Sequence, residues 1–182
     1  MQKKIIILGL GGQGVLFIGK LLSHTGFLDG YRSTYLPTYG PSVQNGPVKA
    51  EVIISSGEIY NPFADPADIV MVLHKQQLAM AEKLITPDGL MITKDFEYQD
   101  SQNYQNLAVF TEEITEELKN QKIGNVVMFG ALSAVIGTFS DNSVGTALKQ
   151  ILLNKPYQMV SLNFKAYKMG RESIKLFSPN NA

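Results

Sequence analysis

Short apolar segments alternate with longer segments of helical periodicity along most of the chain. Residues 4–8 are apolar at nearly every position, which is typical of a strand buried on both faces of a parallel sheet. Residues 15–28 carry apolar side chains at helical spacing and stop just before Gly30, so they predict a helix. Further strands are predicted at residues 31–36, 49–55, 68–73, 89–93 and 107–110, and further helices at 76–84, 125–139, 144–153 and 158–176.

The order of these elements predicts a three-layer α/β/α sandwich of Rossmann-like type with a mostly parallel sheet. Residues 31–36 and 49–55 are two strands without a helix between them, so a mixed sheet stays open. A chain of this length can bury a full core, and we expect one domain over residues 1–182. Residues 125–139 are apolar nearly all round, which predicts a helix buried on several sides. Thr111 precedes two glutamates and is predicted to cap a helix.

The charges of the chain balance, because Lys and Arg total 16 and Asp and Glu also total 16. Nucleic acid or an anionic membrane would favour a basic surplus, so neither is expected as a partner. The chain has no cysteine, which excludes disulfides, thiolate metal sites and iron–sulfur ligation within it, and no metal site is predicted.

The first residues lack the pattern of a signal peptide, since glycines follow the short apolar run at once. The longest apolar stretch, residues 126–139, is too short to span a bilayer. We therefore expect a cytoplasmic protein, and the absence of cysteine fits a reducing compartment.

A glycine-rich segment follows the first predicted strand directly and precedes the first predicted helix. Gly9, Gly11 and Gly14 fit the G-x-G-x-x-G spacing of phosphate-binding turns, with Gly12 and Gln13 inside it. Such a turn leaves backbone N–H groups at the start of a helix available to an anion. The sequence therefore predicts a binding turn formed by Gly9, Gly11, Gly12, Gln13 and Gly14.

Two common interpretations of this segment are incomplete. A dinucleotide site needs an acidic residue at the end of the second strand, where residues 35–38 read Tyr-Leu-Pro-Thr. A P-loop needs Ser or Thr after its Lys, but Lys20 is followed by Leu21. A stand-alone nucleotide-binding module remains an alternative, resting on the glycine segment alone.

The segment 37–47 is the strongest loop signal, with three prolines and two glycines. Amide side chains and an aromatic residue on a proline-rich loop favour a contact with a partner or a substrate. The residues expected to make that contact are Tyr39, Gly40, Pro41, Gln44, Asn45 and Gly46. His74 ends a predicted buried strand at the carboxyl edge of the sheet, and either a structural or a site-lining role stays open for it.

Taken in order, these segments resemble the gamma subunit of 2-oxoacid:ferredoxin oxidoreductases, which act on pyruvate, 2-oxoisovalerate, 2-oxoglutarate or indolepyruvate. The resemblance covers residues 5–170. Its marks are the glycine segment 9–15, Tyr39-Gly40-Pro41, Ser55 followed by Ile59 and Pro62, Asp68, Gly124-Asn125, Gly130-Ala131, Asn163, Ala166 and Gly170.

The resemblance implies a subunit of a hetero-oligomeric enzyme rather than an enzyme by itself. Thiamine diphosphate would lie between alpha and beta subunits, iron–sulfur clusters would lie in beta and delta parts, and ferredoxin would accept the electrons. The glycine turn would face the phosphates of coenzyme A. His74 and Asn125 are expected to contact the residues of this site rather than the ligand. The isolated chain would be inactive and could form a homodimer.

The chain departs from the family at one loop, where Gln44-Asn45-Gly46 replaces Arg-Gly-Gly. An amide cannot make the charged bidentate contact that arginine makes with a carboxylate or phosphate. The sequence leaves open the 2-oxoacid, the subunit stoichiometry and the electron acceptor. It also leaves open a purely structural role in assembly, with the glycines serving close packing.

Overall fold

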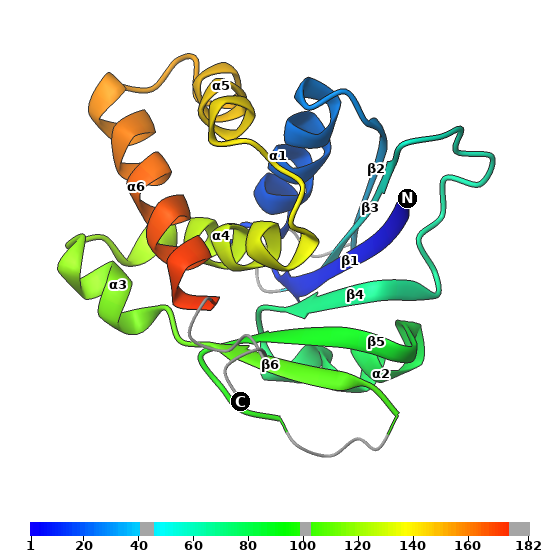
Figure 1. Cartoon of the computed structure of the whole chain (residues 1–182). Helices are drawn as coiled ribbons and strands as arrows, with labels where there is room; N and C mark the ends of the chain where they lie inside the picture. The colour runs from blue at the N-terminus through cyan, green and yellow to red at the C-terminus, as the bar shows by residue number, and fades with distance from the viewer. Residues whose placement is uncertain (41–45, 99–102, 175–182) are drawn as a thin grey trace, which may run out of the picture.

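A computed structural model describes residues 1–40, 46–98 and 103–174 of the chain (Figure 1). Its centre is a six-stranded sheet with the order β2-β3-β1-β4-β5-β6. The strands are β1 Gln2–Leu10, β2 Arg32–Tyr39, β3 Pro47–Ser55, β4 Ala67–Val72, β5 Ile85–Lys94 and β6 Gln105–Val109. The helices are α1 Val15–Leu28, α2 Leu78–Leu84, α3 Glu112–Glu117, α4 Gly124–Ile136, α5 Asp141–Ile151 and α6 Tyr157–Ser173, with short 3₁₀ turns η1 Lys75–Gln77 and η2 Gln121–Ile123.

The sheet is mixed, which the sequence had left open because no helix is predicted between the strands at residues 31–36 and 49–55. Strands β1, β4, β5 and β6 run parallel, whereas β3 is antiparallel to both of its neighbours, β1 and β2. Strand β3 therefore separates β1 from β2. Its first residue, Pro47, pairs with Leu10 at the end of β1, and Val48 pairs with Tyr39 at the end of β2. The β2–β3 hairpin thus returns the chain to the carboxyl end of β1.

Helices cover both faces of the sheet, but unequally. Figure 1 shows α1, α4, α5 and α6 on one side and α2 on the other. Alternate residues of β1 belong to different hydrophobic clusters: Ile5 and Ile7 to the larger one, Ile6 and Leu8 to the smaller one. The prediction that this strand is buried on both faces is confirmed, and so is the three-layer α/β/α architecture.

Helices α4 and α6 cross backbone to backbone on the larger side. A Cβ atom added at Gly130 would lie 2.2 Å from the carbonyl oxygen of Tyr167. One added at Gly170 would lie 2.1 Å from the carbonyl oxygen of Val127. Both glycines are therefore required for packing, and the predicted burial of the apolar helix on several sides is confirmed.

Two local predictions were wrong. Strand β2 continues to Tyr39, so Pro37 lies inside a strand that was predicted to end before it. Proline is tolerated there because β2 is an edge strand, and an edge leaves one side of the ladder unpaired. Thr111 precedes α3 but its side chain makes no cap; its hydroxyl donates a hydrogen bond to Asp95 instead.

Candidate functional site

The glycine turn connects the end of β1 to the start of α1 and is closed by Gln13. The backbone N–H of Gln13 donates to the carbonyl of Leu10 (3.1 Å), and the Gln13 Oε1 atom accepts the N–H of Leu10 (2.8 Å). Gly12 and Gly14 have φ angles of 92° and 84°, a region that side chains rarely adopt. The amide of Gln13 therefore fixes the shape of the turn.

The glycines of this turn have different reasons to be glycine. A Cβ atom at Gly9 would lie 2.7 Å from Val15, and one at Gly14 would lie 2.1 Å from the amide nitrogen of Asn125. At Gly12, by contrast, an added Cβ would meet no atom within 4 Å. Packing explains Gly9 and Gly14, while Gly12 is exposed and borders open space.

Two backbone donors of the turn are available to a ligand. Within the described part of the chain, the N–H groups of Gly12 and Gly14 donate no hydrogen bond. Consecutive N–H groups around positive-φ residues form concave anion sites, especially at the start of a helix. The turn can therefore accept an anion without rearrangement of its backbone bonds.

The structure brings both ends of the predicted partner-facing loop next to the glycine turn. The N–H of Gly11 donates to the carbonyl of Gly46 (2.9 Å). Between the turn and the end of β2 lies an apolar hollow of about 340 Å³. It is lined by Leu10, Gly11, Gly12, Gly14, Val15, Leu16, Phe17, Tyr39, Gly40 and Val48. The predictions for Pro41, Gln44 and Asn45 fall outside the described residues.

A second hollow, about 560 Å³ in volume, also borders the glycine turn and is called the polar hollow because amide and lysine residues and glycines line it. Its lining residues are Gly12, Gln13, Lys94, Gln121, Lys122, Gly124 and Asn125. Asn125 thus lies beside the turn, and its supporting role stays a prediction, whereas the two lysines were missed from the sequence. The available signal was the position of Lys94, the last residue of β5, because ligands of α/β proteins bind at the carboxyl ends of parallel strands.

Lys94 is held by an acidic neighbour whose own charge is stabilised. Its ammonium forms an ion pair with Asp95. The Asp95 carboxylate also accepts the backbone N–H and the hydroxyl of Thr111. Burial alone would raise the pKa of Asp95, but the bonds from Lys94 and Thr111 together hold this pKa below its usual value. Asp95 is therefore ionised at neutral pH.

His74 has a structural contact and borders neither hollow at the glycine turn. It follows β4 and precedes η1, where its Nδ1 atom accepts the N–H of Gln76 at 3.3 Å. This bond caps the short 3₁₀ turn η1. Of the two interpretations left open by the sequence, the geometry favours the structural one.

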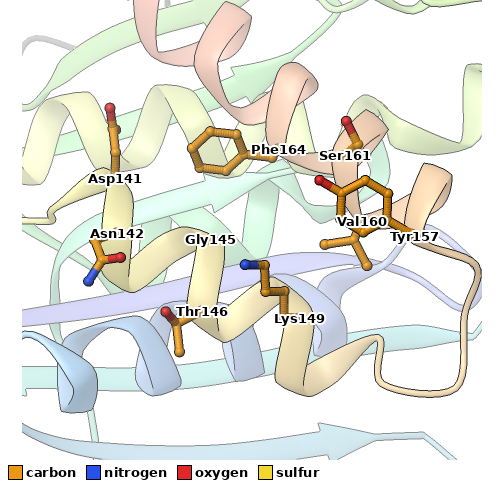
Figure 2. A pocket seen from close by; sticks show the side chains of 9 residues that line it. All are labelled: Asp141, Asn142, Gly145, Thr146, Lys149, Tyr157, Val160, Ser161 and Phe164. Atoms are coloured by element: carbon orange, nitrogen blue, oxygen red, sulfur yellow. The ribbon is translucent and has the colours of Figure 1, made fainter.

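A third hollow, of about 380 Å³, lies between α5 and α6, and none of the residues that line it is a predicted site residue (Figure 2). Phe164 and Tyr157 of α6 and Thr146 and Lys149 of α5 line it. Asp141 at its end is bound to Lys168 and Arg171.

The described residues hold no group of side chains suited to a metal ion. No helix in the described ranges is long and apolar enough to cross a membrane.

The fold and the turn define a Rossmann-like α/β chain with a glycine-rich turn at the carboxyl edge of its sheet. Residues 4–173 match the family model described as pyruvate ferredoxin/flavodoxin oxidoreductase. The chain therefore belongs to this family, and the prediction of a gamma-type subunit of 2-oxoacid oxidoreductases is confirmed.

Relatives of the chain cover nearly its whole length. It is 32% identical to the 2-oxoglutarate synthase subunit KorC of Methanothermobacter marburgensis, over 96% of this chain and 97% of the relative. Its fold is similar to the gamma subunit of a keto/oxoacid ferredoxin oxidoreductase from Geobacter sulfurreducens, with a TM-score of 0.78, 24% identity and coverage of 97% and 98%. It is also similar to 2-oxoglutarate:ferredoxin oxidoreductase from Magnetococcus marinus, with a TM-score of 0.87 and 20% identity, covering 97% of this chain and 32% of that one.

Proposed function

We propose that this chain acts in a complex with alpha, beta and in some arrangements delta subunits. The complex oxidatively decarboxylates a 2-oxoacid: the 2-oxoacid anion, coenzyme A and oxidised ferredoxin give acyl-coenzyme A, carbon dioxide, a proton and ferredoxin reduced by two electrons. Thiamine diphosphate and iron–sulfur clusters belong to the partner subunits in this proposal. The lack of cysteine supports that division, because this chain has no thiolate for a cluster.

The proposal takes 2-oxoglutarate as the first substrate to test, because several similar curated chains are subunits of 2-oxoglutarate synthases. Pyruvate, 2-oxoisovalerate and indolepyruvate are the comparison substrates. A cytoplasmic location is part of the proposal, and the absence of cysteine is compatible with it.

In this proposal the glycine turn binds the diphosphate of coenzyme A. The observation that carries it is Gly12: it is exposed, it borders both hollows, and its N–H has no partner among the described residues. Packing accounts for Gly9 and Gly14 but not for the open space at Gly12. An anion at the turn would receive backbone donors at the start of α1, where the helix dipole also favours negative charge.

A second function, purely structural assembly, has one observation in its favour. The close contacts at Gly9 and Gly14 show that the turn is needed for packing of β1 against α1 and of Asn125 against the turn. In a turn used only for packing, a carboxylate at Gly12 would add only the backbone strain that any side chain causes at a φ of 92°, because nothing lies within 4 Å of the added Cβ, and it would leave coenzyme A binding unchanged.

The two functions are separated by the substitution Gly12→Asp in the complex purified with its native partners. Gly30→Asp is the matched control, because Gly30 also has a positive φ (84°) and open space around its added Cβ. A carboxylate at Gly12 would repel the diphosphate, and we expect the KM for coenzyme A to rise about tenfold or more, equivalent to about 1.4 kcal/mol. The KM for the 2-oxoacid is expected to stay unchanged.

Equal coenzyme A kinetics in the two variants would overturn the binding role of the turn and favour the structural one. Purification of the chain from its source without a thiamine-binding subunit and a cysteine-rich subunit would overturn the complex itself. Calorimetric binding of NAD(H), FAD or ATP to the isolated chain would support instead a stand-alone nucleotide-binding module.

A further inference from the structure

We propose that Lys94 and Lys122 bind a phosphate monoester of the ligand and thereby select coenzyme A over analogues that lack its 3′-phosphate. The proposal rests on the proposed function, because it assumes that the diphosphate occupies the neighbouring glycine turn. It assigns a specificity role to the polar hollow, which shares Gly12 with the apolar one.

The chemistry of the polar hollow fits a phosphate group. Two ammonium groups and the amides of Gln13, Gln121 and Asn125 line it, and no carboxylate is among its described lining residues. Outside the lining, Asp95 forms an ion pair with Lys94. Counting that carboxylate, the two lysines leave a local surplus of one positive charge. A monoester is close to a dianion at neutral pH, whereas each diphosphate group carries about one charge.

The structure positions Lys94 at the edge of this hollow. A Cβ atom at Gly124 would lie 3.3 Å from the Lys94 Cε atom, so the lysine stem passes over the first residue of α4. The side chain of Lys94 is 28% exposed. The bond to Asp95 uses one of three ammonium donors, which leaves two for a phosphate oxygen. Asp95 thus positions Lys94 without neutralising its capacity to donate.

Lys122 extends from a backbone that is fixed by side-chain bonds. The Asn120 Oδ1 atom accepts the N–H of Lys122 at 3.0 Å. One residue earlier, Gln121 accepts the hydroxyl of Thr115 at 3.1 Å. The side chain of Lys122 is exposed, so its charge is screened by solvent and its contribution should depend on salt more than that of Lys94.

The test compares coenzyme A with dephospho-coenzyme A, which lacks only the 3′-phosphate. Binding of each to the purified complex is measured by calorimetry without the 2-oxoacid, and the KM of each is measured by turnover. The variants are Lys94→Gln, Lys122→Gln and the double variant. Lys83→Gln is the charge-matched control, since Lys83 is exposed on α2 across the sheet.

We expect the native complex to bind coenzyme A at least tenfold more tightly than dephospho-coenzyme A. The double variant should bind both ligands about equally, while Lys83→Gln should keep the native ratio. An unchanged ratio in the double variant, with Gly12→Asp still weakening both ligands, would overturn this inference and leave the proposed function standing. No effect of Gly12→Asp on either ligand would overturn both.

Discussion

At the scale of single residues, the glycines of the motif have different structural roles. Gly14 is held against Asn125, whereas Gly12 borders open space. The spacing of the motif predicted where the turn lies, but it could not separate these roles, because they depend on a residue more than a hundred positions away. Gln13 was predicted as part of the binding turn, and its side-chain oxygen accepts a hydrogen bond from the N–H of Leu10 within that turn.

Asp95 offers a residue-scale prediction in which charge alone is changed. Asp95→Asn keeps the shape of the side chain and tolerates the φ of 57°, since Asn adopts left-handed backbone readily. It weakens the bonds to Lys94 and Thr111, and we expect the free energy of unfolding at neutral pH to fall by about 1–3 kcal/mol. Chemical denaturation at several pH values measures the change.

The pH dependence follows from the lowered pKa of Asp95 in the folded state. A carboxyl group with a lowered folded pKa stabilises the protein above its unfolded pKa, about 3.9, and this stabilisation is lost as the pH falls through the folded value. The stability difference from the native chain should therefore shrink in acid. Asp88→Asn is the control, with a φ of 63° and an exposed side chain; an equal loss in both variants would contradict the prediction.

At the scale of elements, the contact between α4 and α6 depends on two missing side chains. Gly170→Ala would place a methyl group 2.1 Å from the Val127 carbonyl oxygen, a backbone atom that cannot rotate away. We expect a loss of unfolding free energy of about 2 kcal/mol or more, because the helices must separate. Thermal and chemical unfolding of the variant measure it.

Gly145→Ala in α5 is the matched control for this substitution. Both glycines lie inside helices, so both substitutions gain the helix propensity of alanine, about 1 kcal/mol. The added Cβ at Gly145 would lie 3.6 Å from the Phe164 ring, an ordinary contact. Gly145→Ala should therefore be neutral or stabilising, and a destabilisation as large as that of Gly170→Ala would show that close packing is not the cause.

Periodicity predicted most elements, and its failures have physical causes. Strand β1 and helix α4 were recognised as buried because nearly all of their residues are apolar, on both faces of the strand and all round the helix. The end of β2 was missed because Pro37 is a breaker in most strands and is harmless only at a sheet edge. The predicted cap at Thr111 was wrong because Thr111 bonds to Asp95 with a helical backbone (φ −95°, ψ −14°), whereas a capping residue has an extended one.

At the scale of the whole molecule, the two faces of the sheet have unequal cover. On one face, α4 has ten of its thirteen residues buried. On the other face, α2 has seven residues and only Ala81 is buried. The layer order could be predicted from the sequence, but this asymmetry could not, because the contribution of a helix to each face is set by tertiary packing.

Hydrogen exchange should report this asymmetry directly. Few buried contacts allow a segment to open without unfolding the rest, so we expect α2 amides to exchange faster than those of α4 by about a hundredfold or more. Exchange followed by mass spectrometry at neutral pH measures both helices in one sample. Equal protection in α2 and α4 would mean that the smaller layer opens only when the whole chain unfolds.

The candidate site was predictable in part for a topological reason. The glycine turn and Tyr39–Gly40 were both singled out by local sequence, and they meet because β3 returns the hairpin to the end of β1. Lys94 and Lys122 were not found, because their approach to the turn depends on the order of strands and on α4. For Lys94 the one sequence signal was its place at the carboxyl end of a strand, whereas nothing in the sequence around the exposed Lys122 indicates the hollow that it borders.

Strand β3 pairs with β1 and with β2 along nearly its whole length, so the register of the sheet does not depend on the connection between β2 and β3. Its pairing with β1 runs from Gln2–Ser55 to Leu10–Pro47, and its pairing with β2 runs from Arg32–Ser55 to Tyr39–Val48. Register is thus set along both sides of β3, independently of the number of residues that join Gly40 to Gly46. We therefore expect insertions and deletions between those two glycines to cost little folding free energy, which makes this connection a suitable place to graft new binding sequences.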